Sequence, residues 1–287
     1  MKSFFSAFGA VLVTGAFFWS APVLADLQLN MPEGVTTSSR EIYSLHMQIM
    51  LVCAVIAAGV YAAMVYALVK FRKSKGAVPA KFSHSTMAEI IWTVIPCVIL
   101  IVMAIPAAES LVRLEDTRNS ELTLKITGYQ WQWQYEYIDQ DVSFFSMLDR
   151  ESNLARQPDS GLDPYEVENY LLEVNQRVVV PVDTKIRLLI TAADVLHAWW
   201  MPDFGVKKDA IPGFINETWF EATETGVFRG QCAELCGMDH GFMPIVVEVV
   251  SREEFSEWLI EMGASEPAFS TERESSEGAT LRTAFNE

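Results

Sequence analysis

Two cysteines, a histidine and a methionine with side chains that can bind metal lie within twelve residues of one another in the C-terminal half of the chain. They are Cys232, Cys236, His240 and Met243. A second histidine, His197, follows an earlier apolar stretch. Thiolate and imidazole ligands with a weak thioether are typical of electron-transfer copper. A single copper ion of this kind needs only one cysteine. The second thiolate could bridge two metals, so the pattern favours a two-copper cluster.

Two other interpretations of these residues stay open at this point. Cys232 and Cys236 could form a disulfide, which an exported location permits. The four-residue spacing in a tight loop is awkward for that bond, however, and it leaves both histidines and Met243 unexplained. A Cys₂His₂ zinc site would use both cysteines and both histidines. It would leave the methionine without a role, and closed zinc sites usually carry their cysteines as C-x-x-C pairs.

The first 25 residues are typical of a secretory signal peptide. Lys2 is their only charged residue, an apolar stretch follows, and small residues precede Asp26. This pattern predicts cleavage after Ala25. The alternative is an uncleaved membrane anchor, but the apolar core is short for a bilayer span.

Two later apolar runs, Ile49–Val69 and Ile90–Ala108, predict a transmembrane helix hairpin. Each approaches the ~20 residues that a helix needs to cross a bilayer. Residues 70–88, between the two runs, carry five lysines and arginines and no acid. The positive-inside rule therefore places that loop in the cytoplasm and both outer flanks on the other side of the membrane.

From Glu121 onward, short runs rich in β-branched and aromatic residues predict an all-β domain, a Greek-key sandwich or barrel. The expected strands are Leu122–Thr127, Tyr129–Tyr137, Tyr170–Val174, Val178–Val180, Lys185–Thr191, Glu217–Glu221, Val227–Gly230 and Pro244–Val250. Residues 142–169 read as a surface insertion. Ser251 and Glu254 form a capping box that predicts a C-terminal helix.

The chain thus divides into a signal peptide (1–25), an N-terminal segment with the hairpin (26–118), a β domain with its helix (119–262) and a disordered tail (263–287). The 287 residues are 51% hydrophobic, which excludes disorder of the whole chain, and a net charge of −16 argues against nucleic acid as a partner. Residues 119–262 contain 25 acids and 10 bases. Such a domain would attract a basic redox partner.

Four features in this order resemble subunit II of bacterial haem-copper cytochrome c oxidases. They are the hairpin, the aromatic run Gly128–Tyr137, the stretch Asp209–Gly213 and the segment Cys232–Met243, called the cysteine loop below. The resemblance covers the chain to about residue 262 and implies a cupredoxin-like β barrel. One departure is Gln132, where many relatives have a tyrosine between the two tryptophans.

The resemblance also implies a ligand set for a binuclear copper A centre. The side-chain ligands would be His197, Cys232, Cys236, His240 and Met243, with the backbone carbonyl of Glu234. The two sulfurs would bridge the coppers. The carboxylate of Glu234 would serve a magnesium or manganese site shared with subunit I.

Two further residues gain roles from the resemblance. Trp131 would be the point at which electrons from cytochrome c reach the domain, whereas the other aromatics of its run could simply be packing. Glu89, at the cytoplasmic edge of the second span, would lie at the mouth of a proton channel into subunit I. The alternative for Glu89 is an interfacial acid that favours a helix N-terminus.

The resulting hypothesis is the electron-accepting subunit of a respiratory oxidase in the bacterial inner membrane, with its β domain in the periplasm. It would take electrons from cytochrome c and pass them to haem in subunit I, which reduces dioxygen to water. The chain has no C-x-x-C-H motif, so haem is expected in the partner only. Expected docking acids, chosen by their nearness in sequence to the functional loops, are Glu136, Asp139, Asp141 and Asp194.

Two alternatives belong to other functional classes. A quinol oxidase subunit II would share the fold, but it lacks the copper ligands that this chain carries. A membrane-anchored copper or zinc binding protein or chaperone would bind metal without belonging to a catalytic complex. Metal stoichiometry separates the three: two coppers for the oxidase, one metal for a chaperone and none for the quinol type.

Overall fold

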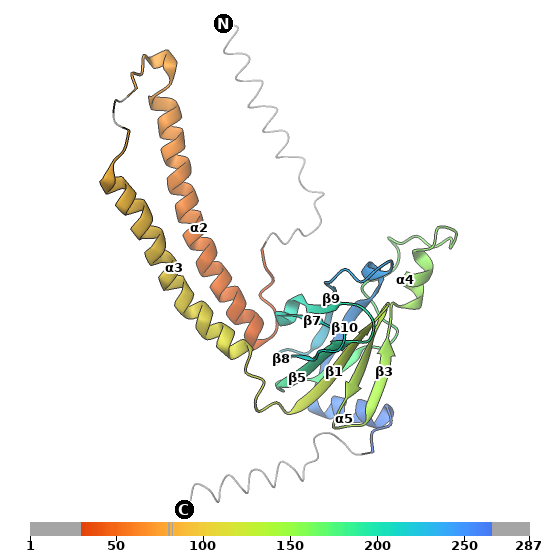
Figure 1. Ribbon diagram of the computed structural model, residues 1–287. Helices are drawn as coiled ribbons and strands as arrows, with labels where there is room; N and C mark the ends of the chain where they lie inside the picture. The colour runs from red at the N-terminus through yellow and green to blue at the C-terminus, as the bar shows by residue number, and fades with distance from the viewer. Residues whose placement is uncertain (1–29, 80, 82, 266–287) are drawn as a thin grey trace, which may run out of the picture. The chain divides into compact units, whose positions relative to one another are not determined.

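The computed structural model describes residues 30–79, 81 and 83–265 (Figure 1). The expected signal peptide lies outside the described residues, and so does the expected tail after Ser265.

Two long helices follow the N-terminal segment: α2 (Thr37–Lys70) and α3 (Thr86–Leu114). Thr36 caps the first, its side chain accepting a hydrogen bond from the Ser39 amide while the Ser39 hydroxyl contacts the Thr36 backbone. Both helices are long and apolar enough to cross a membrane, and most of their apolar side chains are exposed. This confirms the predicted hairpin. The connection carries a short 3-10 turn, η1 (Lys73–Lys75).

The β domain contains two five-stranded sheets (Figure 1). The first has the order β3-β2-β1-β5-β8 and the second the order β4-β10-β9-β6-β7. The first sheet comprises β1 (Leu122–Tyr129), β2 (Gln132–Tyr137), β3 (Val142–Ser146), β5 (Ile186–Ala192) and β8 (Asn216–Phe220). The second comprises β4 (Val178–Pro181), β6 (His197–Met201), β7 (Val206–Ala210), β9 (Gly226–Cys232) and β10 (Pro244–Val250).

Strand register places the alternating apolar residues of the first sheet on one face. Strands β1 and β5 run parallel, and Leu124 lies beside Leu188 while Ile126 lies beside Ile190. All four side chains are almost completely buried. Because side chains alternate between the two faces of a strand, this register assembles a continuous apolar layer. The all-β prediction is confirmed as a two-sheet sandwich.

The C-terminal helix α5 (Arg252–Glu261) begins at the predicted capping box. The Ser251 hydroxyl accepts from the Glu254 amide, and the Glu254 carboxylate accepts from the Ser251 amide. Phe255 and Leu259 are completely buried in the core of the sandwich, and Trp258 packs on Tyr137 with ring centroids 5.3 Å apart.

Several predicted elements were wrong. Tyr170–Val174 forms no strand, only an isolated bridge between Val174 and Leu148. The expected strand Tyr129–Tyr137 is divided, because β1 ends at Tyr129 and β2 begins at Gln132. The expected insertion 142–169 contributes β3 to the first sheet and a short helix, α4 (Arg150–Ala155).

Strands β6 and β7 were missed because neither sequence alternates clearly. Four of the five residues of β6 are buried, so its sequence lacks the alternation of polar and apolar residues that predicts a strand. Strand β7 has two lysines and an aspartate between its buried end residues, and it reads as a polar loop. Both strands are established by antiparallel pairing with each other, and β6 pairs also with β9.

Candidate metal centre

Three strands of the second sheet bring the predicted ligands together. Cys232 is the last residue of β9, and Met243 immediately precedes β10, so two paired antiparallel strands hold both ends of the cysteine loop. His197 is the first residue of β6, in which Trp199 pairs with Cys232. Ligands that are 35 residues or more apart in sequence, such as His197 and Cys232, therefore lie in contact.

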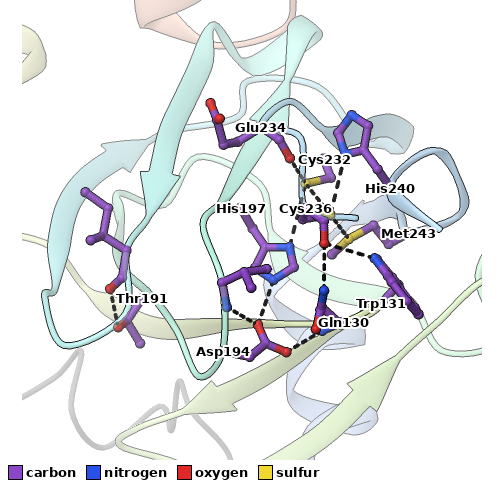
Figure 2. Close-up of polar contacts among 12 residues, drawn as sticks. Gln130, Trp131, Thr191, Asp194, His197, Cys232, Glu234, Cys236, His240 and Met243 are labelled. Atoms are coloured by element: carbon purple, nitrogen blue, oxygen red, sulfur yellow. Dashed lines mark hydrogen bonds and ion pairs between the residues drawn. The ribbon is translucent and has the colours of Figure 1, made fainter. Parts of the chain in front are cut away.

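The two cysteine sulfurs form the middle of the cluster, with their Sγ atoms 3.9 Å apart. The Nδ1 atom of His197 lies 3.9 Å from the sulfur of Cys232, and Nδ1 of His240 lies 3.5 Å from the sulfur of Cys236. Figure 2 shows the two imidazole rings on opposite sides of the sulfur pair.

Two further predicted ligands face the same sulfurs. The thioether Sδ of Met243 lies 3.5 Å from the Cys236 sulfur, and the Cys232 thiol donates to the backbone carbonyl of Glu234 at 3.4 Å. Met243, Cys232 and Cys236 are all buried. The structure thus brings together all six residues of the predicted set, with the Glu234 carboxylate turned away from the sulfurs (Figure 2).

The donor set fits a pair of soft metal ions better than either alternative. The two sulfurs are almost twice as far apart as in a disulfide, in which they are about 2.05 Å apart. A tetrahedral zinc site would gather both imidazoles around one point and leave out the thioether. Here each imidazole approaches a different sulfur, and the thioether also points into the cluster. Two thiolates between two imidazoles suit two copper ions with bridging sulfurs.

The two thiols differ in acidity. Burial would raise the pKa of Cys232, but its hydrogen bonds with His197 and with the backbone outweigh it and lower that pKa. Burial and the neighbouring Cys232 thiolate raise the pKa of Cys236 to about 12. Two thiolates this close repel each other unless a cation lies between them. Metal binding at this site therefore releases protons.

Asp194 orients the imidazole of His197. Its Oδ1 accepts from His197 Nε2 at 3.0 Å and from the Val195 amide at 2.6 Å, while its Oδ2 accepts from the Gln130 amide at 2.7 Å. These contacts hold the proton on Nε2 and direct Nδ1 to Cys232. A carboxylate on the far side of a metal-binding histidine is the usual device for fixing its tautomer. Sequence reasoning had assigned Asp194 to docking only.

Gly128 and Trp133 pack against the same imidazole. A methyl group at position 128 would lie 2.8 Å from Cδ2 of His197, so only glycine leaves room for the ring. The indole of Trp133 is completely buried, with its centroid 5.8 Å from that of His197, and its Nε1 donates to the Met243 carbonyl at 3.3 Å. Neither role had a sequence signal beyond membership of the aromatic run.

Trp131 contacts the cysteine loop directly. Its indole is half-buried, and Nε1 donates to the carbonyl of Cys236 at 3.3 Å. The side-chain amide of Gln130 donates to the same carbonyl at 2.9 Å. Gly237 has φ of 119° and passes close to both side chains, which favours glycine there. Three other aromatics of the run, Trp133, Tyr135 and Tyr137, are buried in the core.

The other predicted residues lie apart from the cluster. Glu89 is exposed in the first turn of α3. Glu136 is paired with Lys125 on the neighbouring strand at 2.9 Å. Asp139 and Asp141 lie in the turn between β2 and β3, at the end of β2 that is remote from Trp131.

Comparisons with known proteins match both parts of the chain. The family model described as "Cytochrome C oxidase subunit II, transmembrane domain" matches residues 25–109. The model described as "Cytochrome C oxidase subunit II, periplasmic domain" matches residues 122–250.

Named relatives agree with these matches. The "Probable cytochrome c oxidase subunit 2" of Rickettsia bellii is 39% identical over 260 residues, which cover 90% of this chain and 92% of the relative. The "Cytochrome c oxidase subunit 2" of Cereibacter sphaeroides is 38% identical over 221 residues, covering 74% of this chain and 72% of the relative.

A solved structure of the periplasmic domain of subunit II of the Bradyrhizobium japonicum oxidase is 46% identical, covering 51% of this chain and 96% of its own, with a TM-score of 0.44. The family matches and the full-length relatives together cover the helix pair and the β domain. The chain therefore belongs to the cytochrome c oxidase subunit II family, as a membrane-anchored subunit of an oxidase complex.

Proposed function

We propose that this subunit accepts electrons from reduced cytochrome c at a binuclear copper A centre and passes them to haem in subunit I, where dioxygen is reduced to water. The observation that carries the proposal is the sulfur pair of Cys232 and Cys236, 3.9 Å apart, with a histidine ring at each sulfur. The proposed ligands are His197, Cys232, Glu234 through its carbonyl, Cys236, His240 and Met243.

Each residue around the site has a physical task in this proposal. When bound, the copper pair supplies a one-electron acceptor whose charge is shared over two metals. Cys232 and Cys236 would hold the ions through their thiolates, and Asp194 keeps the Nδ1 lone pair of His197 directed at the site. Burial of both cysteines and of Met243 keeps water out. The loop ends are fixed by paired strands, so the ligands move little when the charge changes.

Trp131 is the proposed point at which the electron reaches the domain. Its half-buried ring is one hydrogen bond away from the backbone of the ligand residue Cys236. The excess of acids in residues 119–262 would attract a cytochrome c whose haem edge is basic. Glu136 and Asp194 remain the nearest proposed docking acids in sequence, although each already has a partner within the chain.

Two acidic residues and the orientation in the membrane also belong to the proposal. The Glu234 carboxylate, directed away from the sulfurs, would hold a magnesium or manganese ion at the contact with subunit I (Figure 2). Glu89 would receive protons at the mouth of a channel into subunit I. The basic loop would face the cytoplasm and the domain 119–262 the periplasm, after removal of residues 1–25.

Rapid mixing of reduced cytochrome c with the assembled oxidase tests the proposal. Replacing Trp131 by alanine should slow electron transfer from bound cytochrome c by orders of magnitude while copper content stays normal. The matched control is Tyr165→Ala, which removes a ring of the same domain that is 98% exposed. Equal transfer rates in wild type and Trp131→Ala would contradict the proposed route.

Metal analysis of the same preparation distinguishes the two alternative functional classes from the proposed one. One metal ion per chain, with no dependence of its redox state on cytochrome c, would indicate a chaperone. Absence of copper would indicate the quinol type.

A further inference from the structure

The segment expected to be a plain surface insertion reaches the cysteine loop through one side chain. Arg156 is the C-cap of the short helix α4. Its Nη1 donates to Oδ1 of Asp239 at 3.0 Å, and its guanidinium carbon lies 4.3 Å from the ring centroid of Phe242. The arginine therefore contacts residues on both sides of His240.

His240 needs such support more than His197 does. The His197 ring is held by Asp194, but within the described part of the chain no hydrogen bond is found for Nε2 of His240. The orientation of His240 therefore depends on its backbone, the 3-10 turn η3 (His240–Phe242). That turn is a single one, closed by backbone bonds such as that from the Phe242 amide to the Asp239 carbonyl at 2.9 Å.

The carboxylate of Asp239 is not used to cap this turn. Asp239 stands at the N-cap position, yet its side chain makes no cap hydrogen bond. It is directed to Arg156 instead, and both side chains of the pair are about three-quarters buried, with exposures of 23% and 25%. A partly buried, charge-assisted bond is stronger than an exposed ion pair. Stacking of the guanidinium on Phe242 adds a cation–π contact.

Arg156 is itself held in place. Its Nε donates to Oδ1 of Asn153 at 2.7 Å. Helix α4 is anchored by Ser152, which is completely buried and accepts from the Leu171 amide at 3.3 Å, and by buried Ala155. These contacts fix the position of the guanidinium against the cysteine loop.

We propose that Arg156 is a positioning residue for the metal centre: it clamps Asp239 and Phe242, keeps the His240 imidazole aligned with the sulfur pair, and so slows local opening of the loop and loss of metal. This inference rests on the proposed copper site. The ring of His240 is the ligand that moves when the clamp is removed, because His197 has its own restraint.

Amide hydrogen exchange on the metal-free full chain in detergent tests the clamp without copper. Arg156→Ala should speed exchange at residues 237–243 roughly tenfold, the usual effect of losing one partly buried charged contact. Exchange in β1 and β5 should not change. The matched control is Arg118→Ala, which removes an arginine whose side chain is 83% exposed and pairs with nearby Asp116.

Asp239→Asn provides a second variant that keeps the side-chain shape, and it should show the same local acceleration. Arg156→Lys should restore part of the protection, because the charge remains while the planar stacking on Phe242 is lost. Unchanged exchange at 237–243 in both Arg156→Ala and Asp239→Asn would overturn the proposal. Faster exchange throughout the β domain would overturn it too, since that result would mean that Arg156 stabilises the whole domain and not the cysteine loop in particular.

Copper-loaded protein separates this inference from the proposed function. Release of copper to a chelator should be roughly tenfold faster in Arg156→Ala, with an altered electron paramagnetic resonance spectrum, because His240 is less well held. Wild-type release rates and spectrum in this variant would contradict the clamp. A wild-type chain that binds no copper pair would refute the proposed function, while the exchange result would still decide the clamp.

Discussion

Replacing Gly128 by alanine tests how tightly the site is built around His197. The added methyl group would lie 2.8 Å from Cδ2 and 3.0 Å from Cγ of the imidazole. Carbon atoms normally pack about 3.5–4.0 Å apart, so the ring or the strand must move by roughly 0.7 Å. The ring cannot move freely, because Asp194 holds Nε2 and Trp133 packs against the ring in a T-shaped arrangement.

Overpacking of this kind costs about 1–3 kcal/mol of unfolding free energy. For a domain of this size, that loss lowers the melting temperature by about 3–15 °C. Thermal unfolding of the metal-free chain, followed by tryptophan fluorescence, measures it. The copper spectrum of the loaded chain should also change, since Nδ1 of His197 is displaced with the ring.

Gly241→Ala is the matched control for this substitution. It makes the same change beside the other histidine, but no atom of the residues that the structure describes lies within 4 Å of the added methyl group. Its melting temperature should stay within about 2 °C of wild type, as expected for an exposed substitution. If Gly128→Ala also has the melting temperature and the copper spectrum of the wild type, the inference that His197 is tightly packed is wrong.

Three further outcomes follow from charged groups. Binding of cytochrome c should weaken steeply as salt rises, because exposed charges more than ~10 Å apart are screened at 0.1 M; salt-independent affinity would exclude electrostatic docking. Glu89→Ala should slow turnover of the assembled oxidase and leave copper reduction unchanged, and normal proton uptake would return Glu89 to an interfacial role. Glu173 is partly buried, which opposes ionisation, but hydrogen bonds from Arg177 and Arg229 lower its pKa below the unfolded value. Its stabilisation is present above the unfolded pKa and lost as pH falls through the folded pKa. Glu173→Gln should therefore lower stability by about 1–2 kcal/mol at pH 7, and the difference in melting temperature should shrink as the pH falls below the unfolded pKa.

Local patterns were enough to predict the elements that carry strong one-dimensional signals. The hairpin follows from two long apolar runs, and helix α5 begins at its capping box because Ser251 and Glu254 satisfy each other's backbone amides. The cysteine loop was recognisable because thiol, imidazole and thioether donors lie so near one another. Each of these depends on residues that are close in sequence.

The missing parts depend on pairing between distant residues. Strand β7 is polar along most of its length and exists because it pairs with β6. The roles of Asp194 and Gly128 come from the approach of β6 to the start of the aromatic run, and their types alone do not reveal it. Arg156 acts across 83 residues of sequence on Asp239. Sequence nearness likewise gave Asp139 and Asp141 a docking role, although they lie at the far end of β2 from Trp131.

The most direct measurement of the central claim is copper content and the electron paramagnetic resonance spectrum of the full chain, in wild type and in Cys236→Ser. The wild type should hold two coppers per chain with one unpaired electron shared between them. Cys236→Ser should lose that signal, because a serine oxygen cannot replace a bridging sulfur. Two coppers with the same shared signal in Cys236→Ser, or zinc in place of copper in the wild type, would contradict the account.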